Sequence, residues 1–159
     1  MIKKLTFSLL FLLILSSCSS SRKISSAAKF KRNKAEKIVA NALKYKGVKY
    51  KYGGTTRKGM DCSGIVFVAF GKEKIKLPRV SKNMAKTGKK VSLKKAKKGD
   101  LIFFKTRKRY ANINHVGLIV SVKNGQIRFI HSTTSKGVII SSLSQKYWRK
   151  AFVKINRVL

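Results

Sequence analysis

The chain has 159 residues, of which 39 are Lys or Arg and only four are Asp or Glu, so its formal net charge is +35. The length fits one domain with one core. The scarcity of carboxylates disfavours a glycosidase, because its pair of acids would have to come from Glu36, Asp61, Glu73 and Asp100. The basic residues are spread along the chain without a nucleic-acid-binding motif, so nucleic acid is disfavoured as a partner. Two interpretations of the positive charge remain: it lies on a solvated surface, or it attracts an anionic lipid or polymer.

The first 17 residues have the features of an export signal. Lys3 and Lys4 precede an apolar run, residues 5–15, that is too short to span a membrane. The run ends in a Leu-Ser-Ser-Cys sequence that resembles the lipobox of bacterial lipoproteins. That resemblance implies cleavage before Cys18 and lipidation of its thiol, and two or more acyl chains anchor a protein stably. The alternative is a plain secretory signal, with Cys18 incidental or in a disulfide with Cys62.

The signal is followed by a tether and then by the domain. Residues 18–32, the lipidated Cys18 and the Ser- and Lys-rich stretch after it, lack regular periodicity, which predicts a flexible tether. Residues 33–159 are the expected domain. Apolar residues at helical spacing predict an amphipathic helix from Asn33 to Lys46, which Gly47 ends.

The rest of the chain predicts one further helix and then strands. Residues 48–60 are expected to form a loop, and the apolar run 62–70 predicts a short buried helix whose first turn carries Cys62. Residues 107–114 are expected to be an exposed loop. Runs of β-branched and aromatic residues between turn residues predict strands at 100–104, 115–120, 127–131, 137–140 and 151–155. Helices first and strands after indicate an α+β fold with an antiparallel sheet.

Few residues of this chain can carry nucleophilic chemistry. Apart from the cysteine of the signal, Cys62 is the only thiol, and His115 and His131 are the only imidazoles. A thiol nucleophile needs a base that titrates near neutral pH, as His does. Asn124-Gly125 predicts a hairpin that brings both histidines to the same end of the sheet. Cys62 could then attack, His115 take its proton and His131 orient His115. A zinc site would need the same three residues without a short-range ligand pair, which disfavours a metal.

The position of Cys62 at a helix N-terminus predicts an activated thiol. The helix dipole, free backbone N–H groups and a protonated His would lower the pKa of the thiol into a range of about 3.5 to 7.5. The N–H groups of Cys62 and Ser63 could hold the oxyanion of a tetrahedral intermediate. Gly64 would permit close packing or a close approach of substrate.

Several short motifs together resemble the NlpC-type cell-wall peptidases, which are papain-like cysteine peptidases of bacterial envelopes. They occur in the family's order and cover about residues 40–159. The matching pieces are Tyr50-Lys-Tyr-Gly-Gly54, Asp61-Cys-Ser-Gly64, Leu77-Pro-Arg79, Lys98-Gly-Asp-Leu101, His115-Val-Gly117 and His131-Ser132. The resemblance implies a papain-like NlpC-type fold with N-terminal helices packed on an antiparallel sheet. The lipobox and the single domain make the chain most similar to the small lipoprotein murein endopeptidases.

The resemblance also implies roles for individual residues. Cys62 is implied to be the nucleophile, His115 the base and His131 the polar residue that orients it. Four neighbours are implied to support the nucleophile or to contact the peptide substrate: Tyr50, Asp61, Ser63 and Arg79.

Three positions carry an alternative interpretation. Met84 stands where family members often have Gln, which puts substrate contacts from that loop in doubt. Asp61 could be only the N-cap of the helix that follows it. Asp100 fits a turn or the start of a strand better than a catalytic role.

We therefore expect a lipid-anchored cysteine endopeptidase, without metal or organic cofactor, that hydrolyses amide bonds in peptidoglycan stem peptides or cross-links through an acyl-enzyme. We expect a monomer in the cell envelope, held by the lipid on Cys18 to a bacterial membrane, and facing the periplasm from the outer membrane where the cell has two. Its basic surface would attract anionic envelope polymers. The alternatives are a non-catalytic wall-binding module on the same fold, and an acyltransferase or amidase on a papain-like fold.

Overall fold

The computed structural model describes residues 25–106 and 112–159. The signal sequence, Cys18 and the first part of the expected tether lie outside the described residues, as do residues 107–111 of the expected exposed loop. No helix in the described part of the chain is long and apolar enough to cross a membrane.

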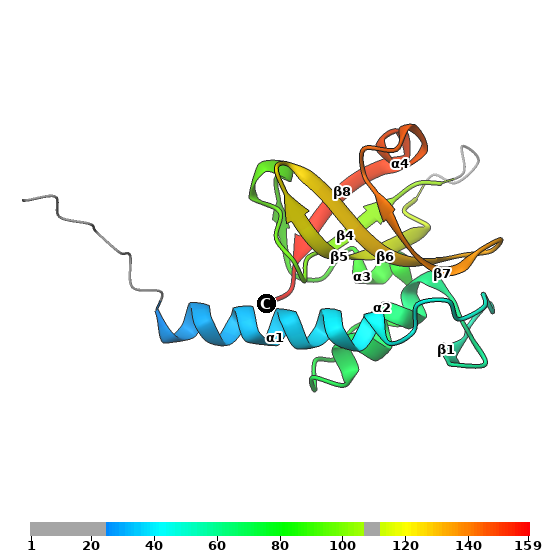
Figure 1. Cartoon of the computed structure of the whole chain (residues 1–159), viewed down its shortest axis with the longest axis horizontal. Helices are drawn as coiled ribbons and strands as arrows, with labels where there is room; N and C mark the ends of the chain where they lie inside the picture. The colour runs from blue at the N-terminus through cyan, green and yellow to red at the C-terminus, as the bar shows by residue number, and fades with distance from the viewer. Residues whose placement is uncertain (1–24, 107–111) are drawn as a thin grey trace, which may run out of the picture.

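The first helix, α1 (Ser26–Leu43), begins seven residues before the expected start. Ser25 caps it, because its hydroxyl accepts a hydrogen bond from the Ala28 N–H at 3.2 Å. Residues 26–32, which we expected in the tether, are therefore helical, although their side chains are exposed. Of the predicted apolar stripe, the residues from Ala35 to Ala42 are buried, whereas its last member, Leu43, is exposed; α1 runs along one side of the molecule (Figure 1).

The second helix, α2 (Cys62–Gly71), lies where the apolar run predicts it and packs between α1 and the sheet. Within the predicted loop before it, β1 (Thr55–Thr56) and β2 (Gly59–Met60) form a small hairpin. Gly64 contacts this loop so closely that a Cβ would collide with the carbonyl oxygen of Gly54. Gly64 therefore serves close packing between the helix and the loop.

The main sheet is antiparallel and has the strand order β3-β8-β4-β5-β6-β7. Asn124 and Gly125, both with positive φ, form the turn of the predicted β5–β6 hairpin. This arrangement confirms the expected α+β class. The strands are β3 (Lys89–Val91), β4 (Leu101–Phe104), β5 (His115–Lys123), β6 (Gln126–Thr133), β7 (Gly137–Ser142) and β8 (Phe152–Arg157).

Four further short elements were not predicted from the sequence. These are β3, α3 (Ser81–Met84), a 3-10 helix η1 (Leu93–Lys95) and α4 (Lys146–Ala151). Ala151, expected to begin the last strand, is the final residue of α4. β3 contains two lysines, and its local sequence does not indicate a strand. It is held as a strand by its pairing with β8.

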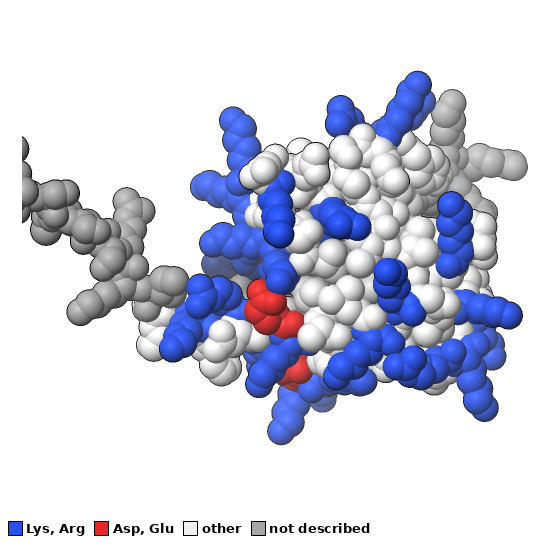
Figure 2. Space-filling view, viewed as in Figure 1, with Lys and Arg blue, Asp and Glu red and all other residues white. Residues whose placement is uncertain are grey.

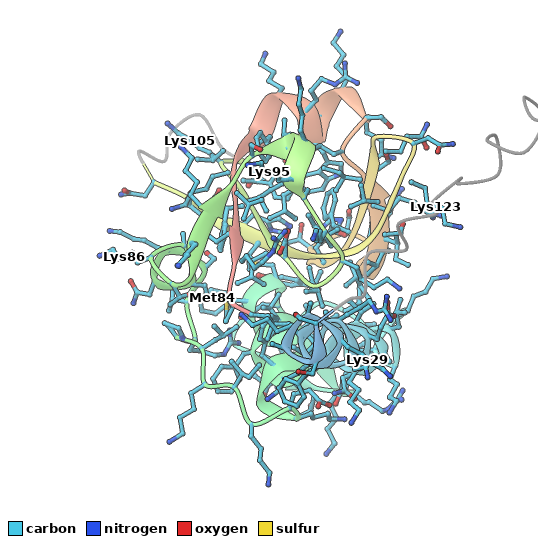
Figure 3. The ribbon with its side chains drawn as sticks, turned by 90° about the vertical axis from the view of Figure 1, so that its left-hand side faces the viewer. Lys29, Met84, Lys86, Lys95, Lys105 and Lys123 are labelled. Atoms are coloured by element: carbon cyan, nitrogen blue, oxygen red, sulfur yellow. The ribbon has the colours of Figure 1, made fainter. Side chains whose placement is uncertain are left out.

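The sheet is buried on both faces, and alternate residues of β4 divide between them. Leu101 and Phe103 pack with α1 and α2, whereas Ile102 and Phe104 pack with Trp148 of α4 on the other face. Met84 is fully buried in the first of these cores, and Figure 3 shows it in the interior. The position where the family often has Gln is thus a core position here.

Candidate active site

Cys62 is the first residue of α2 and remains partly exposed. The residue before it, Asp61, caps the helix by accepting a hydrogen bond from the Gly64 N–H at 2.6 Å. Three backbone N–H groups lie near enough to the sulfur to favour its thiolate, those of Cys62 and Ser63 at the helix N-terminus and that of Val116 on β5. The thiol therefore lies between the start of α2 and the start of β5, beside the peptide that follows His115.

The electrostatics of Cys62 differ from the sequence prediction. Burial raises the pKa of the Cys62 thiol, and the negative charge of Asp61 raises it further, while the three N–H groups lower it by less. The prediction of a thiol with a lowered pKa is wrong for this structure. The pKa is raised because burial removes water from around the thiolate, and this destabilises the thiolate more than the helix N-terminus stabilises it.

His115 and His131 meet as the hairpin predicts. His115 begins β5, His131 lies on β6, and the His115 Nε2 and His131 Nδ1 atoms are 2.9 Å apart. Burial lowers the pKa of His115 to about 4, and burial together with the charge of His115 lowers the pKa of His131 to about 3. Both imidazoles are therefore neutral at pH 7, so no protonated His stands ready to lower the pKa of the thiol.

Two residues that the sequence analysis missed complete the histidine pair. The other ring nitrogen of His131, Nε2, is 2.9 Å from the hydroxyl of Ser141 on β7. Trp148 of α4 stacks on His115 with ring centroids 5.3 Å apart and meets His131 edge-on at 4.6 Å. The predicted strand ended at residue 140, one residue short of Ser141, and α4 was not predicted, so neither residue could be placed.

Asp61, Ser63 and Arg79 form a second group of polar side chains beside Cys62. The Arg79 guanidinium binds the carboxylate with both terminal nitrogens, at 2.9 Å and 2.8 Å. It also donates to the Ser63 hydroxyl at 2.8 Å, and Ser63 in turn donates to Asp61 at 3.2 Å. The Gly53 N–H donates to the other Asp61 oxygen at 2.8 Å.

These bonds make Asp61 a structural centre. Burial would raise the pKa of its carboxyl, but Arg79 and the N–H groups of Gly64 and Gly53 together hold the pKa below its usual value of 3.8. The carboxylate accepts five hydrogen bonds, which join the glycine loop, the helix start and Arg79. Asp61 is therefore the N-cap of α2, but it is not only a cap, and its contact with a substrate stays a prediction.

The remaining predicted residues lie as follows. Tyr50 forms a β-bridge with Met60, two residues before Cys62, and so belongs to the same loop. Asp100 is buried and binds Arg157 at 2.7 Å and the Lys97 N–H at 2.8 Å, which confirms its structural role at the turn before β4. Within residues 25–106 and 112–159, no three His, Cys, Asp or Glu residues lie close enough to hold a metal ion.

Comparison with known proteins shows which family the chain resembles. The model of the NlpC/P60 family matches residues 47–157. Murein DD-endopeptidase MepS/Murein LD-carboxypeptidase of Escherichia coli is 38% identical over 124 residues, which are 77% of this chain and 62% of that protein. The probable endopeptidase NlpC of the same bacterium is 41% identical over 113 residues, 70% of each chain.

A solved structure agrees with the sequence comparison. The crystal structure of an NlpC/P60 family protein from Bacillus cereus superposes with a TM-score of 0.70 at 27% identity. The match covers 79% of this chain and 40% of that one. Because the family model spans most of the domain, including Cys62, His115 and His131, the chain belongs to the NlpC/P60 family.

Proposed function

We propose that this protein is a cysteine endopeptidase that hydrolyses amide bonds in the peptide part of peptidoglycan. The observation that carries the proposal is the placement of the Cys62 sulfur near the N–H groups of α2 and of Val116, the residue that follows the first of the paired histidines. The E. coli relative whose name states a murein endopeptidase activity supports the substrate class.

In the proposed mechanism Cys62 is the nucleophile and His115 the base. His115 takes the thiol proton as the sulfur attacks the carbonyl carbon, and then gives that proton to the leaving amine. The N–H groups of Cys62 and Ser63 stabilise the oxyanion of the tetrahedral intermediate. Water, deprotonated by His115, hydrolyses the acyl-enzyme and regenerates the thiol.

The pKa values determine how the thiol is activated. Because burial raises the pKa of the thiol and lowers the pKa of both imidazoles, the resting site favours neutral groups over a thiolate–imidazolium pair. The proton therefore moves to His115 as the carbonyl is attacked, so catalysis depends on how His115 is oriented and on which of its nitrogens is free.

A digest of purified peptidoglycan with the mature chain, followed by mass spectrometry of the fragments, tests this proposal. New amino termini should appear with the wild type and be absent with Cys62→Ala. Ser19→Ala, a change outside the domain, is the matched control and should cut like the wild type. If wild type and Cys62→Ala give the same fragments or none on several wall types, the peptidase is excluded and the wall-binding module gains support.

We further propose that the mature protein is anchored in the cell envelope through a lipid on Cys18. The support is the export signal with its lipobox-like end, which lies directly before this cysteine. Radiolabelled palmitate should enter the wild type and be lost from Cys18→Ser, with the variant released from the membrane fraction. Equal labelling of both proteins would contradict the anchor at Cys18.

The basic surface supports a weaker, electrostatic attraction to the envelope. Figure 2 shows Lys and Arg side chains along much of the outline of one face, and in Figure 3 Lys86 and Lys105 lie on one side of the view and Lys123 on the other. Retention of the Cys18→Ser protein on isolated envelopes should fall as salt rises from 50 mM to 500 mM, since salt screens such charges. Retention that does not change with salt would exclude this attraction.

A further inference from the structure

Ser141 ends a chain of hydrogen bonds that begins at His115. His115 Nε2 bonds His131 Nδ1, and His131 Nε2 bonds the Ser141 hydroxyl, each at 2.9 Å. β7 pairs with β6 so that Ser141 lies opposite Phe129 and diagonal to His131. Both ring nitrogens of His131 are thus occupied, and on His115 only Nδ1 remains as a possible acceptor for the thiol proton.

No carboxylate is available to take the place of Ser141. The four acidic residues of the chain all lie in the part that the structure describes, and each has another partner. Asp61 binds Arg79, Asp100 binds Arg157, Glu36 binds Lys98 and Glu73 accepts from Asn41. The residue that ends the histidine chain is therefore a neutral hydroxyl.

The protons of this chain can be arranged in two ways. In the first, His115 Nε2–H donates to His131, whose own Nε2–H donates to the Ser141 oxygen, and His115 Nδ1 keeps a free lone pair. In the second, Ser141 donates to His131, His131 Nδ1–H donates to His115, and the His115 proton sits on Nδ1. Only the first arrangement lets His115 accept the thiol proton.

We propose that Ser141 is a positioning residue for this site: its hydroxyl accepts from His131 Nε2–H and so keeps His115 Nδ1 unprotonated and facing Cys62. The proposal rests on the proposed function, since it assigns how the base of that reaction is held. An N–H buried without an acceptor is rarer in proteins than an unpaired acceptor. Removing the hydroxyl should therefore move the His131 proton from Nε2 to Nδ1, which is the second arrangement.

The surroundings of the pair limit the access of water to His131 and Ser141. His131 is fully buried and Ser141 is 6% exposed. Phe129 lies against His131 with ring centroids 4.8 Å apart, and Trp148 closes the pair from the side of α4. The chain of three residues is therefore enclosed, and its terminal acceptor comes from the protein.

Two measurements on the mature protein test this proposal. In steady-state kinetics on soluble muropeptides, Ser141→Ala should lower kcat at least tenfold with KM unchanged, and Ser141→Thr, which keeps the hydroxyl, should restore it. In 15N NMR, His131 should carry its proton on Nε2 in the wild type and on Nδ1 in Ser141→Ala. Ser132→Ala is the matched control, because Ser132 is also buried but donates to the Met60 carbonyl.

Each outcome decides the question. A Ser141→Ala kcat within twofold of the wild type, or a wild-type His131 protonated on Nδ1, overturns the proposal, as does the same proton shift in Ser132→Ala. If the wild type shows no peptidase activity, the proposed function fails while NMR still reports the position of the proton. If Ser141→Ala does not fold, Ser141→Cys, with a weak sulfur acceptor, should give a kcat between those of Ser141→Thr and His131→Ala; a kcat equal to that of Ser141→Thr overturns the role.

Discussion

Two groups of side chains flank Cys62, and they differ in charge. The charged cluster, Asp61, Ser63 and Arg79, contains a carboxylate with five hydrogen bonds and a guanidinium bound to it through two nitrogens. The neutral relay, His115, His131 and Ser141, contains no anion and is buried. The first fixes the loop, the helix start and Arg79 in place, and the second connects neutral groups that can exchange protons.

The difference shows how a chain with four acidic residues distributes them. Asp61 and Asp100 each hold an arginine and cap or close a turn, so the buried carboxylates serve the architecture. The histidines are left without a carboxylate, and their pKa values fall because nothing offsets the cost of burying their charge. The buried carboxylates therefore hold the backbone around the site in place, while the proposed proton transfer involves only neutral groups.

The largest effect that we predict concerns the neutral relay: the protein should lose stability at mildly acid pH. The unfolded histidines bind protons below about pH 6.5, whereas the folded ones do so only near pH 4 and pH 3. The contribution of this pKa difference is therefore complete above pH 6.5 and is lost as pH falls towards 4. Between pH 7.5 and pH 5 the free energy of unfolding should fall by about 2 kcal/mol for each histidine, about 4 kcal/mol together.

Urea unfolding across this pH range measures the effect, and His131→Gln is the variant that isolates it. Gln keeps a hydrogen-bonding side chain but cannot titrate, so the slope of stability against pH should be about halved. An unchanged slope in the variant would show that His131 is not buried in its neutral form.

Asp61→Asn tests the charged cluster and should destabilise the protein by about 3 kcal/mol, because it leaves the partly buried Arg79 without its anion. Glu36→Gln is the matched control. It also removes an acid bound to a basic residue, but both side chains are exposed, so its effect should stay within about 0.5 kcal/mol. Equal urea midpoints for the two variants at pH 7 would contradict the structural role of Asp61.

Periodicity predicted the longer elements of the fold well. The apolar stripe of α1, the helix carrying Cys62 and the β5–β6 hairpin all follow from spacing and from Asn124-Gly125. The short elements could not be predicted in this way. α4 has only six residues and is held by the packing of Trp148 against Phe104 and Phe129, residues far away in the sequence.

The residues of the candidate site could be proposed from the sequence, but their electrostatics could not. The scarcity of Cys and His was enough to select Cys62, His115 and His131. Their pKa values depend on how deeply the sheet and Trp148 bury them, which sequence spacing does not report. Ser141 lay outside the predicted strand, and only the register of β7 against β6 shows that it reaches His131.

The raised pKa of Cys62 makes a prediction about its reactivity. Because the thiol is neutral at pH 7, the rate of alkylation of the free protein by iodoacetamide should rise about tenfold per pH unit between pH 7 and pH 9. Free cysteine, with a pKa of about 8.5, should level off first and serves as the control. Peptide mass spectrometry assigns the modification to Cys62. An alkylation rate that is already constant below pH 7 would indicate a thiolate–imidazolium pair. The relay would then be charged, and it would no longer differ from the charged cluster in this respect.

Ser141→Asp would place an acidic residue in the neutral relay, as Asp61 is in the charged cluster. Of the effects predicted here, it should be the smallest. A carboxylate next to His131 favours the imidazolium, so the pKa of His131 should rise from about 3 by about one unit, or about 1.4 kcal/mol. NMR titration of the ring protons measures the shift. Ser142→Asp is the matched control, because Ser142 follows on the same strand but bonds Ser144. An equal rise in both variants would mean that added negative charge acts at a distance. A rise in Ser141→Asp alone would show that the absence of a carboxylate at this one position contributes to the low pKa of His131.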